Sequence, residues 1–273
     1  MNENEPDYRA QARRYHLGLQ LEPAQLRVLV TPVEGDGGLH QFSLPLDPTT
    51  DRAKALEDAV YATPMLLGDY ASIGVTVVTD NFIPVPTGLA QQGAQVCGML
   101  DEDMGEMLIT DTVTPVIDIA WTIERKVFNF IERTFRNCPV ECSVTPLVRF
   151  LKSKAERGNT AKVFVHFHDR NPRMADIAVF SADAHLLLLT TKACRTEADA
   201  VFFILGAMES AGLSRTDDEV QICGDSSARD AILPLLRKYV RYAVPLIFPS
   251  EAFRMGREAL AAPFPLIVSN LTY

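Results

Sequence analysis

The chain has 273 residues, of which 26 are basic and 35 acidic, giving a formal net charge of −9, and 47% are hydrophobic. This composition is typical of a globular protein with an extensive core. The acidic balance argues against binding DNA, RNA or an anionic membrane surface, because each is recognised by a basic face. Apolar runs such as Ala184–Thr191 are short, so no membrane insertion is predicted. Residues 1–15 contain no apolar signal region, and a cytoplasmic location is expected.

The cysteines are few and irregularly spaced, at Cys97, Cys138, Cys142, Cys194 and Cys223. An odd number without an export signal predicts reduced, free thiols in the cytoplasm. Cys138 and Cys142 are four residues apart, but no second Cys or His pair is near enough in sequence to complete a structural metal site.

The first half begins with a polar leader at residues 1–14 and continues as alternating strands and helices. Runs of β-branched and aromatic residues between Gly, Pro and Asp turns predict strands at Tyr15–Leu21, Gln25–Val33, Leu39–Leu46 and Ser72–Thr79. Thr50 or Asp51 is expected to cap a helix that runs to about Met65. A second helix is predicted over Trp121–Phe135, where Val127, Phe128, Ile131 and Phe135 form one apolar stripe.

A bridge at residues 138–157 precedes a second half with the same order of elements. The bridge predicts a short strand at Pro139–Val144 and a helix from Thr145 to Arg157. Three more strands are predicted at Ala161–His168, Arg173–Ser181 and Ala184–Lys192. The remaining elements are predicted as helices at Thr196–Ala211, Ser226–Arg241 and Ser250–Ala261 and strands at Glu219–Cys223 and Val244–Phe248. The order of elements in each half therefore predicts a mixed five-stranded sheet whose first three strands are antiparallel and sequential.

Several segments carry a resemblance to a known family: WTIERKVFNFIERTF, NCPVECSVTPLVRFL, AKVFVHFH, AHLLLLTTKACRTEADAVFFIL and VQICGDSS. Together they resemble the bacterial family called domain of unknown function 3822. The resemblance implies an α/β protein of two tandem ribonuclease H-like (actin-like ATPase) domains, at 15–137 and 138–273, with no established activity. The bridge CSVTPLVRFL also resembles the segment that precedes the second phosphate hairpin in actin-like proteins of pilus and division machinery.

The resemblance also implies where a nucleotide would bind, and the residues there do not match the requirement. Active members need an aspartate and glycines in each phosphate hairpin, to position Mg²⁺ and to expose backbone N–H groups. The first hairpin, YHLGLQLEPAQLRV, has Glu22 and Pro23 in its turn, and the second has His166 and His168 in place of the expected acid and first glycine. These phosphate hairpins are degenerate, which suggests a pseudo-ATPase.

The segment VQICGDSSAR resembles the turn that holds adenosine, so Gly224, Asp225 and Ser226 are candidate nucleotide-binding residues. An alternative interpretation is an ordinary strand-to-helix turn in which Asp225 or Ser226 caps the helix. Capping accounts for these residue types without a ligand and is preferred. No cofactor is expected, although weak adenosine-type binding of ATP with Mg²⁺ stays open.

His166, His168 and Asp169 form the candidate metal site, because residues two apart on a strand share a face. His185, on a neighbouring strand, is a possible fourth ligand. The alternative is a pair of histidines on the hydrated face of a hairpin, because no established ligand spacing completes the metal site.

Three functions follow from these residues. A non-catalytic scaffold or partner-binding module is favoured, with protein partners and no catalytic residue. The second is a nucleotide-binding protein or ATPase that uses Asp169, Asp183 or Asp225 in place of the missing acids, and the third is a metal-binding hydrolase at the histidine hairpin. We also expect Trp121 to be a core or interdomain anchor and not a ligand platform. Helix stripes are expected to bury Val127, Phe128, Ile131, Phe202, Phe203, Leu205, Leu235 and Leu236.

Overall fold

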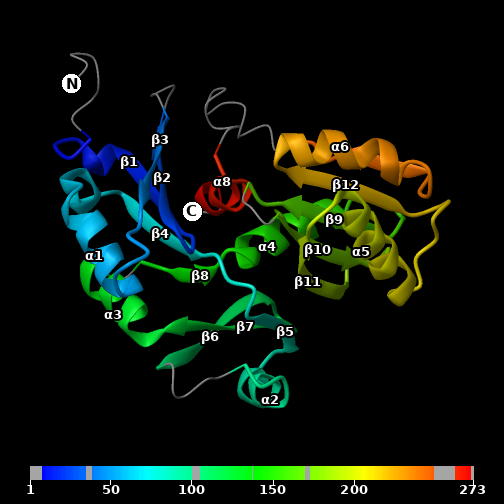
Figure 1. The fold of residues 1–273 in the computed structure, drawn as a ribbon, viewed down its shortest axis with the longest axis horizontal. Coiled ribbons are helices and arrows are strands. Elements are labelled where there is room, and N and C mark those ends of the chain that lie inside the picture. Colours follow the sequence, from blue (N-terminus) through cyan, green and yellow to red (C-terminus); the bar gives the residue numbers. More distant parts are fainter. Residues whose placement is uncertain are drawn as a thin grey trace. The chain divides into compact units, whose positions relative to one another are not determined.

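A computed structural model describes residues 8–34, 39–99, 105–136, 138–169, 173–248 and 262–271. The chain divides into two compact units, a first domain of Met1–Pro146 with Pro249–Tyr273 and a second domain of Leu147–Phe248. Figure 1 traces the chain through both domains. No helix within the described residues has the length and apolar character needed to cross a membrane.

The first domain is built on a mixed five-stranded sheet of order β3-β2-β1-β4-β8. The strands β1, β2 and β3 are sequential and antiparallel, and β4 runs parallel to β1 while β8 runs parallel to β4. Their bounds are β1 Tyr15–Leu21, β2 Gln25–Pro32, β3 His40–Pro45, β4 Ser72–Val77 and β8 Val140–Cys142.

Helices complete the first domain: η1 Ala12–Arg14, α1 Arg52–Tyr61, η2 Pro64–Leu67, α3 Arg125–Thr134 and α8 Phe264–Leu271. The Asp51 side chain caps α1 by accepting from the backbone N–H groups of Ala53 and Lys54. The α8 helix packs closely on β1, because a Cβ added at Gly18 would lie 2.6 Å from Asn270 Oδ1.

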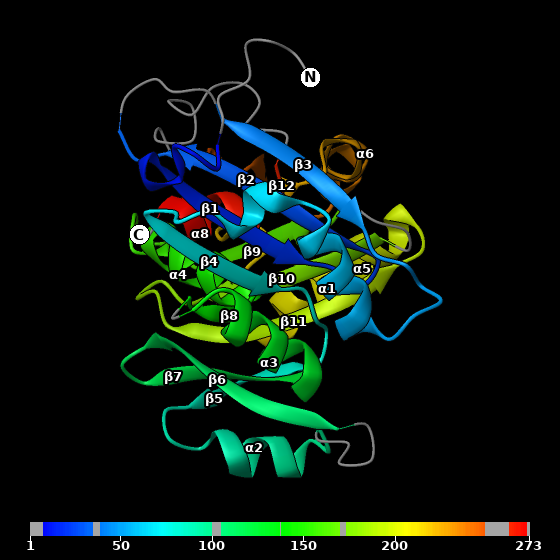
Figure 2. The ribbon, with the colours of Figure 1, turned by 90° about the vertical axis from the view of Figure 1, so that its left-hand side faces the viewer.

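A three-stranded antiparallel sheet of order β5-β7-β6 is inserted between β4 and β8 and was not expected from the sequence. It consists of β5 Phe82–Pro86, β6 Glu106–Thr114 and β7 Ile117–Glu124, with α2 Ala90–Val96 against its outer side (Figure 2). Trp121, in β7, is fully buried and is the core anchor that the sequence predicted.

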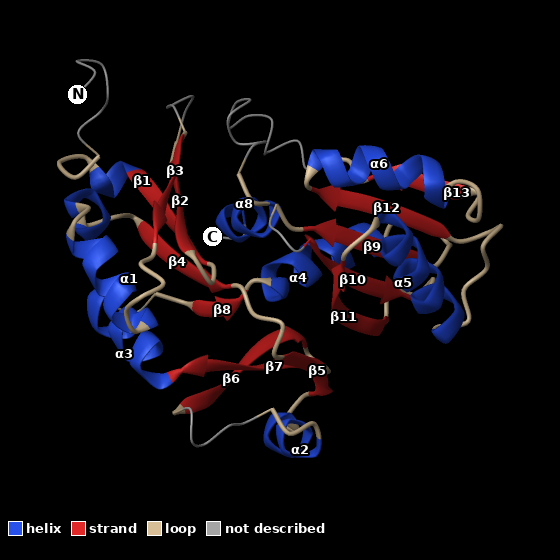
Figure 3. Cartoon of the chain, in the orientation of Figure 1, coloured by secondary structure: helices blue, strands red, loops and turns tan. Residues whose placement is uncertain are grey.

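The second domain repeats the first sheet in strand order and direction, as β11-β10-β9-β12-β13. The bounds are β9 Lys162–Phe167, β10 Arg173–Phe180, β11 Leu186–Cys194, β12 Glu219–Gly224 and β13 Tyr242–Pro245, with α5 Glu197–Ser210 and α6 Ser226–Leu236 (Figure 3). The α4 helix, Val144–Ala155, begins in the first domain and continues into the second. The α5 and α6 helices bury one face of the sheet around Val165, Ile177 and Ile222. The predicted mixed sheet in each half is confirmed.

Some predicted boundaries differ from the structure. The predicted helix over Trp121–Phe135 begins only at Arg125, because residues 117–124 are hydrogen-bonded between β5 and β6. The two compact units divide after Pro146, with β8 in the sheet of the first unit and α8 also in that unit, whereas the sequence predicts a division at residue 138. The predicted helix at Ser250–Ala261 lies outside the described residues, and in the leader Ala12 is buried.

The predicted buried stripes are partly correct. Val127, Ile131 and Leu236 are buried, while Phe128, Phe203, Leu205 and Leu235 are half-buried. The prediction for Phe202 is wrong, since this side chain is 71% exposed. The reason is that α5 is apolar around most of its circumference, so the sequence pattern does not define which side faces the sheet.

Candidate functional site

A row of polar side chains crosses the second sheet on the face opposite α5 and α6. Asp176 of β10 pairs with His166 of β9 on one side and with Thr191 of β11 on the other, and Cys223 of β12 pairs with His166. His168 follows two residues after His166 and shares its face. The strand register therefore sets imidazole, carboxylate and hydroxyl side by side.

The carboxylate of Asp176 is the centre of this row. Its Oδ2 lies 3.0 Å from His166 Nδ1 and 2.7 Å from His168 Nε2, distances at which each ring N–H donates to the oxygen. Its Oδ1 accepts from the Thr191 hydroxyl at 2.7 Å. Asp176 is 3% exposed and His166 4% exposed, so the group is nearly closed to solvent. We call His166, His168 and Asp176 the histidine–aspartate cluster.

The electrostatics of the cluster follow from burial and from these contacts. Burial lowers the pKa of His166, which favours a neutral ring. Burial alone would raise the pKa of Asp176, but the two adjacent imidazoles outweigh it and hold this pKa well below its usual value. Burial also raises the pKa of the Cys223 thiol, and the nearby carboxylate adds to the effect. The carboxylate of the histidine–aspartate cluster is therefore buried near the Cys223 thiol, which stays unionised.

At the start of α6, the Asp225 side chain occupies the helix N-terminus. Its carboxylate accepts from the backbone N–H groups of Ser227 at 3.3 Å and Ala228 at 2.9 Å, and from the Ser227 hydroxyl at 2.6 Å. Gly224 has a φ of +89°, and a Cβ there would lie 2.1 Å from the carbonyl oxygen of Phe167. The close approach of β12 to β9 therefore requires glycine at position 224, whether or not a ligand binds there.

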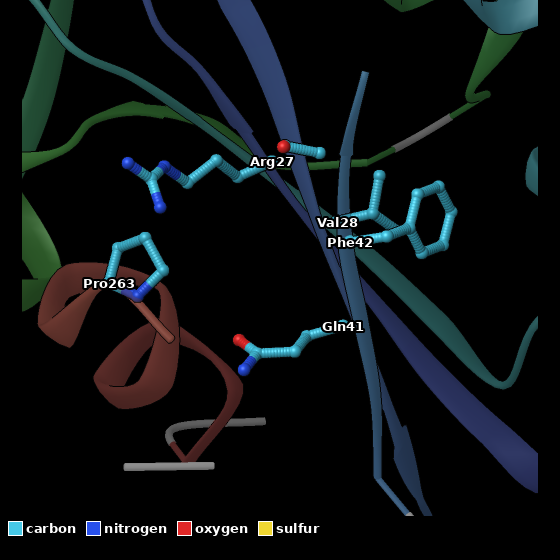
Figure 4. A pocket seen from close by; sticks show the side chains of 6 residues that line it. Arg27, Val28, Gln41, Phe42 and Pro263 are labelled. Carbon is cyan, nitrogen blue, oxygen red and sulfur yellow. The ribbon is translucent and has the colours of Figure 1, made fainter. Parts of the chain in front are cut away.

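In the first domain, the turn between β1 and β2 is held by Glu22. Glu22 Oε1 accepts from Gln20 Nε2 at 2.9 Å and from Arg27 Nε at 2.7 Å, while Oε2 accepts from Gln25 Nε2 at 2.8 Å. Beside it lies a pocket of about 250 Å³ lined by Arg27, Val28, Gln41, Phe42, Ser43 and Pro263. Figure 4 shows the Arg27 and Gln41 side chains extending toward the side where Pro263 lies, with Val28 and Phe42 on the other side of the strands.

The family model described as "Protein of unknown function (DUF3822)" matches residues 5–243 of the chain. The protein belongs to this family. No curated protein matches it in sequence.

Two solved structures place this DUF3822 protein in a known fold. A Bacteroides thetaiotaomicron protein with an actin-like ATPase fold and unknown function is 16% identical, with a TM-score of 0.75 over 89% of this chain and 94% of that one. The PilM–PilN type IV pilus biogenesis complex is 14% identical, with a TM-score of 0.53 over 95% of this chain and 99% of that one. The DUF3822 protein has the actin-like ATPase fold, with its mixed sheets flanked by helices.

The structure of the DUF3822 chain brings together two of the three residues predicted as metal ligands. His166 and His168 meet at Asp176, whereas Asp169 is exposed and lies outside the group of three adjacent ligand atoms. His185 is also exposed and outside that group. Metal binding itself stays a prediction.

Asp176 was missed by sequence reasoning, although a signal for it exists. It is the one acid within the otherwise apolar run MADIAVF, and the register of β9 with β10 places it opposite His166. Of the predicted adenosine-binding residues, Gly224 ends β12, Asp225 caps α6 and Ser226 is the first residue of that helix. The geometry agrees with the capping interpretation of Asp225.

Proposed function

We propose that this protein is a non-catalytic actin-like module that binds a protein partner and does not hydrolyse ATP. The observation that carries the proposal is the Asp225 carboxylate on the first N–H groups of α6. Backbone N–H groups at a helix N-terminus are what a phosphate or sugar oxygen would contact in this part of an actin-like fold. Here an acid of the chain already accepts from them.

The first hairpin supports the same proposal independently. A phosphate needs N–H donors and a positive or Mg²⁺-bridged field. The turn offers Glu22, whose oxygens accept from Gln20, Gln25 and Arg27. The charge of Arg27 is therefore balanced within the hairpin, and a phosphate there would meet a carboxylate.

The proposal that this protein binds a protein partner is supported by its fold. The PilM–PilN structure is, by its name, a complex between proteins, and its likeness to this chain is one of fold. Function depends on the site and not on the fold, so partner binding requires its own test.

Nucleotide binding is tested on the purified full-length chain by isothermal titration with Mg-ATP and by a malachite-green phosphate assay. We expect no phosphate release above the no-protein background and at most weak, adenosine-type binding. Asp225→Ala and Asp169→Ala are measured beside the wild type, with Glu209→Gln as an exposed acidic control. Micromolar binding with turnover that Asp169→Ala or Asp225→Ala abolishes would overturn the proposal in favour of an enzyme.

Partner binding is tested by crosslinking the tagged full-length chain in its native cells and identifying the attached proteins. The same partner should appear in each replicate and should bind the purified chain directly, without added nucleotide. Binding that requires Mg-ATP would contradict the nucleotide-independent module proposed here.

A further inference from the structure

The histidine–aspartate cluster of the second domain has the ligand atoms, spacing and rigidity of a metal site. One ligand atom from each of His166, His168 and Asp176 lies within 4.8 Å of the others. In a tetrahedral site with bonds of about 2.0–2.2 Å, ligand atoms are separated by about 3.3 Å. The two nitrogen-to-oxygen distances of 3.0 and 2.7 Å are already close to this value. Small side-chain rotations would therefore bring the three atoms around one ion.

The scaffold around these atoms is rigid. His166 and Asp176 lie within paired strands of the same sheet, and His168 directly follows β9, with its backbone N–H donating to the carbonyl of Met174. The Thr191 hydroxyl holds Asp176 Oδ1 at 2.7 Å and leaves Oδ2 directed at the two imidazoles. A hydrogen bond to the second oxygen of a ligating carboxylate is the usual outer contact of a metal site, and it fixes the orientation of the ligand.

The charge of the buried Asp176 carboxylate is a further reason to expect a bound cation. Buried carboxylates are stable when they are paired or when they coordinate a metal. In the described part of the chain, the ion-pair contacts of Asp176 are with His166 and His168, and neither Lys nor Arg pairs with it. A divalent cation bound at this position would place positive charge directly beside the buried carboxylate.

We propose that His166 Nδ1, His168 Nε2 and Asp176 Oδ2 bind a divalent transition-metal ion of the Zn²⁺ class, with Thr191 orienting the carboxylate. In the metal-bound state each coordinating nitrogen has its lone pair free, and the ring proton lies on the other nitrogen of that imidazole. Two imidazole nitrogens and one carboxylate oxygen suit Zn²⁺ and Co²⁺, whereas Mg²⁺ and Ca²⁺ take oxygen ligands. Three protein ligands leave a fourth position for water. This site goes beyond the non-catalytic module and does not depend on it.

The test uses the full-length protein after EDTA treatment and exhaustive dialysis. Titration with Co²⁺ should produce the visible absorption bands of a tetrahedral complex, saturating at one ion per chain, and Zn²⁺ should displace the Co²⁺. His168→Gln and Asp176→Asn should each weaken binding by at least about 100-fold, because each removes a ligand. Thr191→Val keeps all three ligands and should weaken binding by about 10- to 100-fold, the usual effect of losing an outer contact.

The matched control is His185→Gln, which removes an exposed histidine outside the cluster and should bind Co²⁺ like the wild type. Circular dichroism of each variant establishes whether it is folded. If a variant that lacks a ligand does not fold, Thr191→Val, which keeps all three ligands, tests the proposal in its place. Absence of Co²⁺ bands together with absence of bound Zn²⁺ in equilibrium dialysis of the folded wild type would overturn the proposal. The cluster would then be a hydrogen-bond network only. Equal loss of binding in His185→Gln would also overturn it, by placing the ion elsewhere.

Discussion

Asp111 in the first domain and Asp176 in the second are buried to a similar degree, 6% and 3% exposed, and differ in their partners. Asp111, in β6, accepts from the Cys142 backbone N–H at 2.8 Å and from the Thr145 hydroxyl at 2.6 Å. Burial outweighs these donors and raises the pKa of Asp111 to about 6. At Asp176 two imidazoles reverse the direction, and its pKa is lowered.

The comparison teaches that the partners, and not the degree of burial, decide the direction in which the pKa of a buried carboxylate shifts. The Asp111 contacts link the inserted sheet to β8 and to the start of α4. The Asp176 contacts stay within one sheet, where adjacent strands present side chains at short and fixed distances. The first arrangement is a structural link, and the second is a candidate ligand set.

The largest expected effect is that of Gly224→Ala, which disturbs the second-domain cluster and spares the first domain. The new Cβ would lie 2.1 Å from Phe167 O and 2.9 Å from His166 Cδ2, at a φ of +89°. We expect a loss of roughly 3–5 kcal/mol in the free energy of unfolding, measured by urea denaturation. The control is Gly206→Ala in α5, where the new Cβ would meet no atom within 4 Å apart from the backbone of its own helix. It should stabilise by about 0.5–1 kcal/mol, and equal losses in both variants would contradict this explanation.

Asp176→Ala should be next in size, because it leaves two buried imidazoles and the Thr191 hydroxyl without their acceptor. Breaking a buried ionic contact costs about 3 kcal/mol. Urea denaturation in EDTA measures this cost without a contribution from metal. A loss below about 1 kcal/mol would mean that the cluster contributes little to folding, and the contrast with Asp111 would then be one of charge only.

Asp111→Asn should change how stability depends on pH. Because the folded-state pKa of about 6 exceeds the ordinary 3.8, the native protein binds the proton more tightly, and wild-type stability falls as pH rises from about 4 to 6. The full effect is about 3 kcal/mol. The variant cannot ionise and should lack this dependence, so its stability relative to wild type rises with pH. Urea denaturation at several pH values tests this, and Asp183→Asn, an exposed control, should follow the wild type.

Asp225→Ala should have the smallest effect, about 1 kcal/mol, the usual cost of losing an N-cap. The substitution also frees the N-terminus of α6 for an anion, because the backbone N–H groups of Ser227 and Ala228 lose their acceptor. Inorganic phosphate should then raise the melting temperature of the variant more than that of the wild type. An equal response in both proteins would show that Asp225 does not exclude anions from this position.

The sequence by itself determined most of the local structure. Alternating apolar residues and turn residues gave the bounds of β1 as Tyr15–Leu21, and capping residues placed the starts of α1, α5 and α6. These features depend on residues within a few positions of each other, so short-range patterns contain the needed information. The repeated order of elements also predicted the two mixed sheets.

Only the tertiary structure decided which distant residues meet. Asp176 reaches His166 through strand register, Asp111 reaches Thr145 from the inserted sheet, and α8 covers Gly18. Phe202 is exposed because the sheet covers a different side of an apolar helix. Such contacts depend on how separate segments pair and pack, and a shift of one residue in register moves a side chain to the opposite face. The metal candidate could therefore be located on its hairpin from sequence, but its carboxylate could be identified only once the strands were paired.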